Sequence, residues 1–134
     1  MVWMTPHRPV AMISPAEARR RANVELAGFP ASITEAYIDF TQRGDVVLLR
    51  YFVLGIMQFY LARPPQLPLT ELPGTTRLVQ DLGCDSLTII DMLFLVERLL
   101  DIRLSDDELS RATTIEGMVE LFHGRAALNN KASV

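Results

Sequence analysis

An apolar run at residues 45–63 constrains the fold of this chain more than any other feature of its sequence. Its apolar side chains cover more than one face of a helix and are Val46, Val47, Leu49, Phe52, Val53, Ile56, Met57, Tyr60 and Leu61. Arg50 and Gln58 interrupt the run, which falls short of the about 20 apolar residues that a membrane span needs. The sequence therefore predicts a helix over residues 45–63 that other elements cover on two sides.

Two shorter helices are predicted before this run. Ser14 is a favourable N-cap for a helix over residues 14–27, and a proline follows it at the first helical position. Ser32 and Glu35 have the spacing of a capping box at the start of a second helix over residues 33–43. The first helix is rich in good helix formers, and the second has its apolar residues on one face.

We expect these two helices to cover the apolar helix at 45–63. The alternative is that residues 1–63 form a homodimer contact or a contact with a membrane surface. We therefore expect the protein to be a monomer, with a dimer through residues 1–63 as the alternative.

The second half of the chain carries three further helix signals. An apolar pattern with helical spacing predicts a helix from Ser86 to about residue 100. Ser105 and Glu108 form a capping-box pattern that starts a short helix. Thr113 and Glu116 repeat the pattern at the start of a last helix.

These signals predict an all-α fold with two parts. Residues 45–124 form a small bundle of three main helices and one short helix, in which Gly124 ends the last helix. Residues 1–44 form an N-terminal helical extension, of which residues 1–13 are expected to be disordered. The polar residues 125–134 are expected to form a flexible tail.

Composition excludes several classes of function. The single cysteine rules out an intramolecular disulfide framework and, with only two histidines, leaves no zinc cluster. The net charge of the chain is −3. Residues 64–124 have a net charge of −7, whereas residues 1–63 have a net charge of +2. This acidic centre argues against nucleic-acid binding. The amino terminus lacks the apolar stretch of a secretory signal, so we expect a cytoplasmic protein.

The loop at residues 81–87 carries the candidate functional site. Gly83 allows a sharp backbone turn. Ser86 then begins a predicted helix, where free backbone N–H groups and the positive end of the helix dipole favour a phosphate group. Asp85 is placed to contact the same surface and to help recruit a metal-dependent transferase. Considered alone, Ser86 is explained as an ordinary N-cap, since serine is a preferred cap in any protein.

The wider sequence around this serine resembles the acyl carrier protein family. Residues 85–87 read Asp-Ser-Leu, the motif around the modified serine of that family, and residues 81–83 read Asp-Leu-Gly, as in many bacterial carriers. The resemblance continues through residues 102–108 and covers residues 78–124. Residues 45–63 correspond to the first helix that the family would place before the motif.

This resemblance implies a discrete carrier protein and not an enzyme. In the family, a phosphopantetheinyl transferase moves 4′-phosphopantetheine from coenzyme A to the motif serine, here Ser86. The thiol of the arm then holds an acyl group as a thioester. Acyl-transferring, condensing or modifying enzymes bind the carrier in turn. No metal site is expected.

The helix that follows Ser86 has two apolar stripes. The predicted core stripe consists of Ile89, Leu93, Val96 and Leu100, with Met92 and Leu99 at its edges. The second stripe is Leu87, Ile90 and Phe94, which in a carrier contacts partner enzymes and borders the groove that shields the acyl chain. Its alternative role is core packing under the N-terminal helices. The acidic residues Asp91 and Glu97 complete the expected partner contacts.

Some positions depart from carriers of ordinary fatty acid synthesis. Thr88 and Arg98 stand where those carriers commonly have acidic residues. Because charges at the rim of an interface select partners, these changes favour a specialised fatty acid, lipid or polyketide-like pathway. The extension at 1–44, which ordinary discrete carriers lack, supports the same prediction. The alternative function is a carrier-like interaction or regulatory subunit that is never modified.

Overall fold

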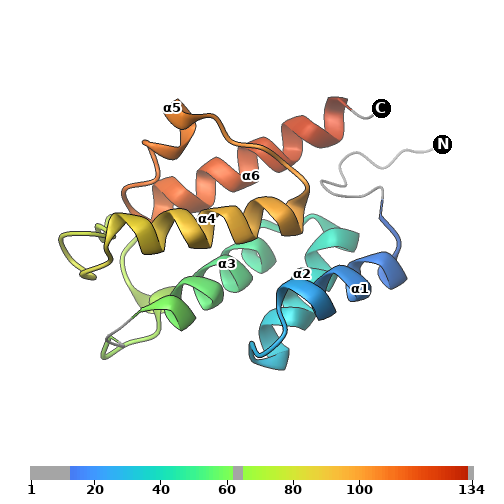
Figure 1. Ribbon diagram of the computed structural model, residues 1–134, viewed down its shortest axis with the longest axis horizontal. Coiled ribbons are helices and arrows are strands. Elements are labelled where there is room, and N and C mark those ends of the chain that lie inside the picture. Colours follow the sequence, from blue (N-terminus) through green and yellow to red (C-terminus); the bar gives the residue numbers. More distant parts are fainter. Residues whose placement is uncertain (1–12, 62–64, 133–134) are drawn as a thin grey trace.

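A computed structural model describes residues 13–61 and 65–132, and helices make up most of both ranges (Figure 1). The elements are α1 Pro15–Glu25, α2 Ala31–Arg43, α3 Val46–Tyr60, the 3₁₀ helix η1 Leu69–Glu71, α4 Ser86–Leu100, α5 Asp106–Leu109 and α6 Ile115–Ala132. No β-strand forms within the two ranges. The predicted all-α class is therefore confirmed. The disorder predicted at the amino terminus lies, for residues 1–12, outside the described residues.

Helix α3 lies at the centre of the fold and contacts α2, η1, α4 and α6. Asp45 starts it, because its carboxylate accepts a hydrogen bond from the backbone N–H of Val47 at 2.9 Å. The side chains that α3 buries are Leu49, Phe52, Val53, Leu54, Ile56 and Met57. The prediction of a helix covered on two sides is thus confirmed. Among the described residues, no helix is long and apolar enough to cross a membrane.

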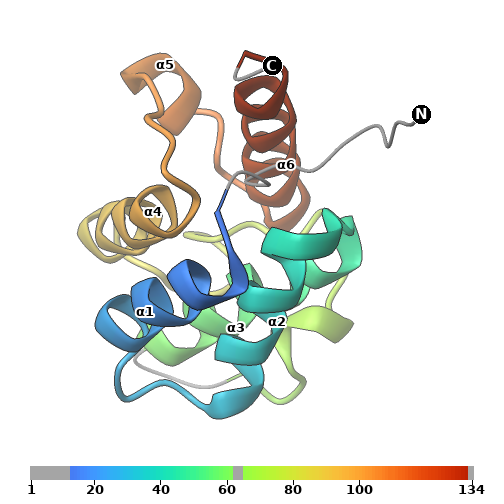
Figure 2. The same cartoon turned by 90° about the vertical axis from the view of Figure 1, so that its right-hand side faces the viewer.

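The N-terminal helices share this core. Tyr37 and Phe40 of α2 are fully buried, and both of their rings pack against Phe52 of α3, with centroid separations of 5.6 and 5.7 Å. Helix α1 packs on α2 and α4, and the three helices lie close together in Figure 2. The prediction that α1 covers α3 is therefore wrong: its main neighbour in the second half of the chain is α4.

Polar contacts join α1 and α2 to the carboxyl end of α4. The Leu99 carbonyl belongs to the last turn of α4, where carbonyl groups have no partner within the helix. It accepts a hydrogen bond from the Tyr37 hydroxyl at 2.8 Å and one from the Arg21 guanidinium at 3.4 Å. Beside it, Arg98 of α4 forms an ion pair with Glu25 of α1 at 2.9 Å. The N-terminal helices therefore stabilise the carboxyl end of α4.

The start of α2 differs from its prediction. Pro30 occupies the N-cap position and no side chain caps the helix, which begins at Ala31. Glu35 turns away from Ser32 and pairs with Arg19 of α1 at 2.8 Å. The predicted capping box is therefore wrong, because the carboxylate finds a charged partner on the neighbouring helix. By contrast, Ser14 caps α1 as expected.

The last helix also differs from its prediction. Its N-cap hydroxyl belongs to Thr114 and not to Thr113, because Thr114 accepts the hydrogen bond from the Gly117 N–H at 3.0 Å. Gly124 does not end the helix, since it lacks the left-handed conformation of a glycine stop. Helix α6 continues to Ala132. The predicted flexible tail is thus helical as far as residue 132.

Removal of the Tyr37 hydroxyl tests the link between α2 and α4. Burial raises the pKa of Tyr37 to about 12, above its ordinary value of 10.0. The stability that depends on the protonated hydroxyl is complete below pH 10 and is lost as the pH rises through 12. We expect the free energy of unfolding of the wild type to fall by about 2–3 kcal/mol over this interval. Tyr37→Phe should cost about 1 kcal/mol at pH 7 and should lack that alkaline loss.

The measurement is urea unfolding at intervals from pH 7 to pH 12 for both proteins. Other groups also titrate in this range, so the difference between the two curves is the quantity of interest. Parallel curves would show that the buried hydroxyl does not titrate as inferred.

Candidate functional site

The loop before α4 is held by backbone hydrogen bonds to the rest of the domain. The Leu78 N–H donates to the Thr113 carbonyl at 2.9 Å, and the Cys84 N–H donates to the Leu78 carbonyl at 3.0 Å. Gly83 adopts the left-handed region with φ of 73°, which confirms the predicted sharp turn. Hydrogen bonds from Arg77 hold the pKa of the Asp81 carboxyl below its ordinary value. The loop therefore presents the next residues in a fixed position.

Asp85, and not Ser86, is the N-cap of α4. One carboxylate oxygen of Asp85 accepts a hydrogen bond from the Thr88 N–H at 2.8 Å, and the other contacts the Thr88 hydroxyl at 3.2 Å. Ser86 is the first residue of the helix and is exposed. Its hydroxyl has no hydrogen-bond partner within residues 13–61 and 65–132. The alternative explanation of Ser86 as an N-cap is thus wrong, and its hydroxyl is free to react.

The first turn of α4 is suited to an anion. The backbone N–H groups of Ser86 and Leu87 make no hydrogen bond to other described residues. They lie at the positive end of the dipole of a 15-residue helix. A phosphate ester on the Ser86 oxygen would therefore lie next to free donors and a favourable field.

The second apolar stripe of α4 lies on the surface. Leu87 is 68% exposed, Ile90 39% and Phe94 44%, and the exposed Asp91 lies on the same face. The alternative that this stripe forms core under the N-terminal helices is wrong, because α1 covers the other end of α4. The core stripe is buried as predicted, except that Ile89 is only half-buried.

Glu97 has a different role from the one predicted. It is only 8% exposed, and its carboxylate accepts a hydrogen bond from the backbone N–H of Leu104. The prediction that Glu97 contacts partner enzymes is therefore wrong: this residue fixes the loop that follows α4. Its place four residues after the core residue Leu93 is a helical-spacing signal that indicates an inward-facing side chain.

An apolar cavity of about 400 Å³ is lined by Ser86 and by other residues of α4 and α5. Its apolar lining includes Leu78, Ile89, Ile90, Leu93, Leu109 and Ala112. A second cavity, of about 610 Å³, lies against Asp85 and Thr88. The cavity that Ser86 borders is thus the one with an apolar wall.

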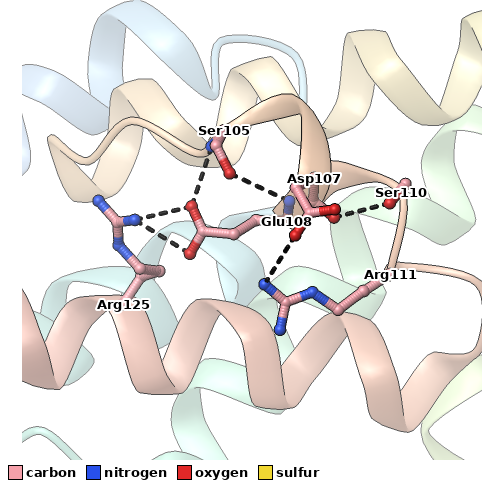
Figure 3. A network of polar contacts seen from close by, with 6 residues as sticks. All are labelled: Ser105, Asp107, Glu108, Ser110, Arg111 and Arg125. Atoms are coloured by element: carbon pink, nitrogen blue, oxygen red, sulfur yellow. Dashed lines mark hydrogen bonds and ion pairs between the residues drawn. The ribbon is translucent and has the colours of Figure 1, made fainter.

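Helix α5, which forms one wall of this cavity, is anchored to α6. Ser105 and Glu108 form the predicted capping box, and Arg125 of α6 pairs with Glu108 at 2.7 Å (Figure 3). Hydrogen bonds from the Ser105 backbone and the Arg125 side chain hold the pKa of Glu108 below its ordinary value. Arg125, predicted to lie in a flexible tail, therefore helps to hold the wall of the cavity in place.

Cys84 is buried beside the site. Burial and the adjacent Asp85 carboxylate both raise the pKa of its thiol. A thiol that stays protonated is a poor nucleophile, so the structure gives Cys84 a packing role.

Two substitutions separate the cap from the candidate attachment residue. Asp85→Ala removes the acceptor for the Thr88 N–H and should lower the free energy of unfolding by about 1 kcal/mol. Ser86→Ala removes a hydroxyl without a partner and should change stability by less than about 0.5 kcal/mol. Chemical unfolding followed by circular dichroism measures both. Equal losses in the two variants would contradict the assignment of the cap to Asp85.

Comparison with known proteins agrees with this geometry. Residues 61–122 match the family model described as the phosphopantetheine attachment site, and this range contains the loop, α4, α5 and the cavity. No solved structure matches the chain. Domains of this family carry a covalently bound 4′-phosphopantetheine group and do not themselves catalyse a reaction. The chain thus contains a phosphopantetheine attachment domain, as its resemblance to the acyl carrier protein family implied.

Proposed function

We propose that Ser86 is the residue to which 4′-phosphopantetheine is attached, and that the chain presents acyl groups on this arm to successive enzymes. The observation that carries the proposal is the exposed Ser86 hydroxyl, which is free because Asp85 caps the helix. A transferase needs such a hydroxyl to form the phosphodiester. Ser86 also lies inside the matched range of the attachment-site family.

The residues around Ser86 fit the group. The phosphate is favoured by the helix dipole and by the free N–H groups of Ser86 and Leu87. These two N–H groups stay free because the Asp85 carboxylate bonds to Thr88. When bound, the arm supplies a thiol that forms a thioester with an acyl group. The chain contributes position and shelter, while the partner enzymes supply the catalytic residues.

The apolar cavity supports an acyl cargo. Ser86 borders it, and its lining includes the buried Leu78, Leu93 and Ala112. Apolar surface of this kind favours hydrocarbon over charged groups. A carrier that shelters an acyl chain here would leave the exposed Leu87, Asp91 and Phe94 for contact with enzymes, while Ile90 borders both the cavity and the exposed stripe.

We also propose a specialised fatty acid, lipid or polyketide-like pathway. Neither Thr88 nor Arg98 is acidic, so neither position offers a negative charge to a partner. Their side chains contact Asp85 and Glu25 instead. Asp91 is the acidic residue left on the exposed stripe. Enzymes that select a strongly acidic carrier would therefore find few of the charges that they need.

Attachment to Ser86 is tested by mass. The full chain is incubated with coenzyme A, magnesium and a broad-specificity phosphopantetheinyl transferase, and its intact mass is measured. We expect the wild type to gain one phosphopantetheine group and Ser86→Ala to gain none. Ser110→Ala, at the exposed end of α5, is the matched serine control and should be loaded like the wild type.

The outcomes of this experiment are distinct. A gain by Ser86→Ala would place the attachment at another residue. No gain by a folded wild-type protein, also with the transferase of its own organism, would favour the unmodified interaction subunit.

Partner selection is tested with a malonyl transferase of ordinary fatty acid synthesis. This protein and a carrier of that pathway are first converted completely to their phosphopantetheine forms, as verified by mass. We expect the kcat/KM for malonyl loading to be about tenfold lower for this protein than for the fatty acid carrier. This factor corresponds to the loss of about 1.4 kcal/mol of favourable interaction with charges at the rim of the interface. Comparable values for the two carriers would contradict the specialised pathway.

A further inference from the structure

The exposed stripe of α4 does not end in open solvent at its carboxyl end. Phe94 is followed one helical turn later by Arg98, and Arg98 pairs with Glu25 in the last turn of α1. Figure 1 shows α1 beside the carboxyl half of α4 and away from its amino end, where Ser86 lies. The surface of α4 therefore continues directly onto α1.

Helix α1 has one flank toward α2 and another toward α4. Arg19 pairs with Glu35 of α2, whereas Arg21 and Glu25 contact α4. Val24 directly precedes Glu25 and is 71% exposed on the outer face of α1, opposite its buried residues Ala18 and Ala22. An exposed apolar side chain thus lies in the same helical turn as Glu25 of the Arg98–Glu25 pair.

We propose that the last turn of α1, through Val24, forms part of the surface that the phosphopantetheinyl transferase binds when it modifies this protein. The inference rests on the proposed attachment at Ser86. It adds the N-terminal extension to the binding surface, and so gives residues outside the matched family domain a direct part in recognition.

The dimensions agree with a single interface. Twelve residues separate Ser86 from Arg98, which corresponds to about 18 Å along a helix. A standard protein interface covers about 800 Å² on each partner, a patch about 30 Å across. A transferase that places its active site at Ser86 and follows the exposed stripe therefore reaches the last turn of α1.

The charges indicate the chemistry of the partner surface. Arg98 and Glu25 neutralise each other, so this pair adds no net charge to the far end of the patch, where Val24 offers an apolar contact. Asp91 is the acidic residue in the middle of the patch. The transferase face that fits is apolar at both ends, with one basic group opposite Asp91.

Steady-state loading of the full chain tests this surface, with coenzyme A, magnesium and a broad-specificity phosphopantetheinyl transferase. Val24→Glu and Val24→Arg introduce opposite charges at the same exposed position. Val47→Glu and Val47→Arg are the matched controls, because Val47 is 69% exposed on α3, which is not part of the patch. We expect both Val24 variants to raise the KM for the carrier about five- to tenfold with kcat unchanged.

Both Val47 variants should keep the wild-type KM. Wild-type kinetics in the two Val24 variants would overturn the inference, as would equal effects at Val24 and Val47. Opposite effects of Glu and Arg at Val24 would also overturn it, because they would indicate long-range charge and not contact. Failure of the wild type to be loaded at all would instead overturn the proposed attachment at Ser86, and the inference with it.

Discussion

Burial of α3 on two sides is the constraint on which the rest of this structure depends. The carrier helices α4 and α6 cover part of its surface, and α2 covers another part with Tyr37 and Phe40 against Phe52. Without α2, these large apolar side chains would face water, at a cost of about 25 cal/mol for each Å² exposed. The N-terminal helices are therefore part of the folded core and share it with α3, α4 and α6.

Two adjacent residues at the start of α4 have different roles: Asp85 caps the helix, and Ser86 presents an exposed hydroxyl. Asp85 satisfies the Thr88 N–H, and so the hydroxyl of Ser86 is not needed to stabilise the helix. At the other end of the helix, Glu97 and the Tyr37 hydroxyl satisfy backbone groups that would otherwise lack partners. The exposed stripe between the two ends takes no part in these contacts.

Local signals in the sequence predicted most of the helices and the place of the candidate site. Ser14 and the Ser105–Glu108 pair act within one turn of chain, and the alternation of buried and exposed positions in α4 follows from helical spacing. Two of the errors arose where a distant residue competes. Glu35 leaves its capping box for Arg19, and Arg125 holds α5 from a segment that looks like a tail. The Arg98–Glu25 pair joins residues 73 positions apart, so no local pattern indicated it.

The contacts between the two halves also decide how the surface of α4 responds to salt. The net charges of +2 for residues 1–63 and −7 for residues 64–124 suggest attraction between the halves. Yet Arg19 is paired within the N-terminal helices, and the buried link to α4 is a neutral hydroxyl on a carbonyl. Salt screens exposed charges and has little effect on buried apolar and hydrogen-bonded contacts. Salt therefore weakens the Arg98–Glu25 pair between α1 and α4 and slows the approach of a charged partner to Asp91, while the hydrogen bond from Tyr37 of α2 to α4 persists.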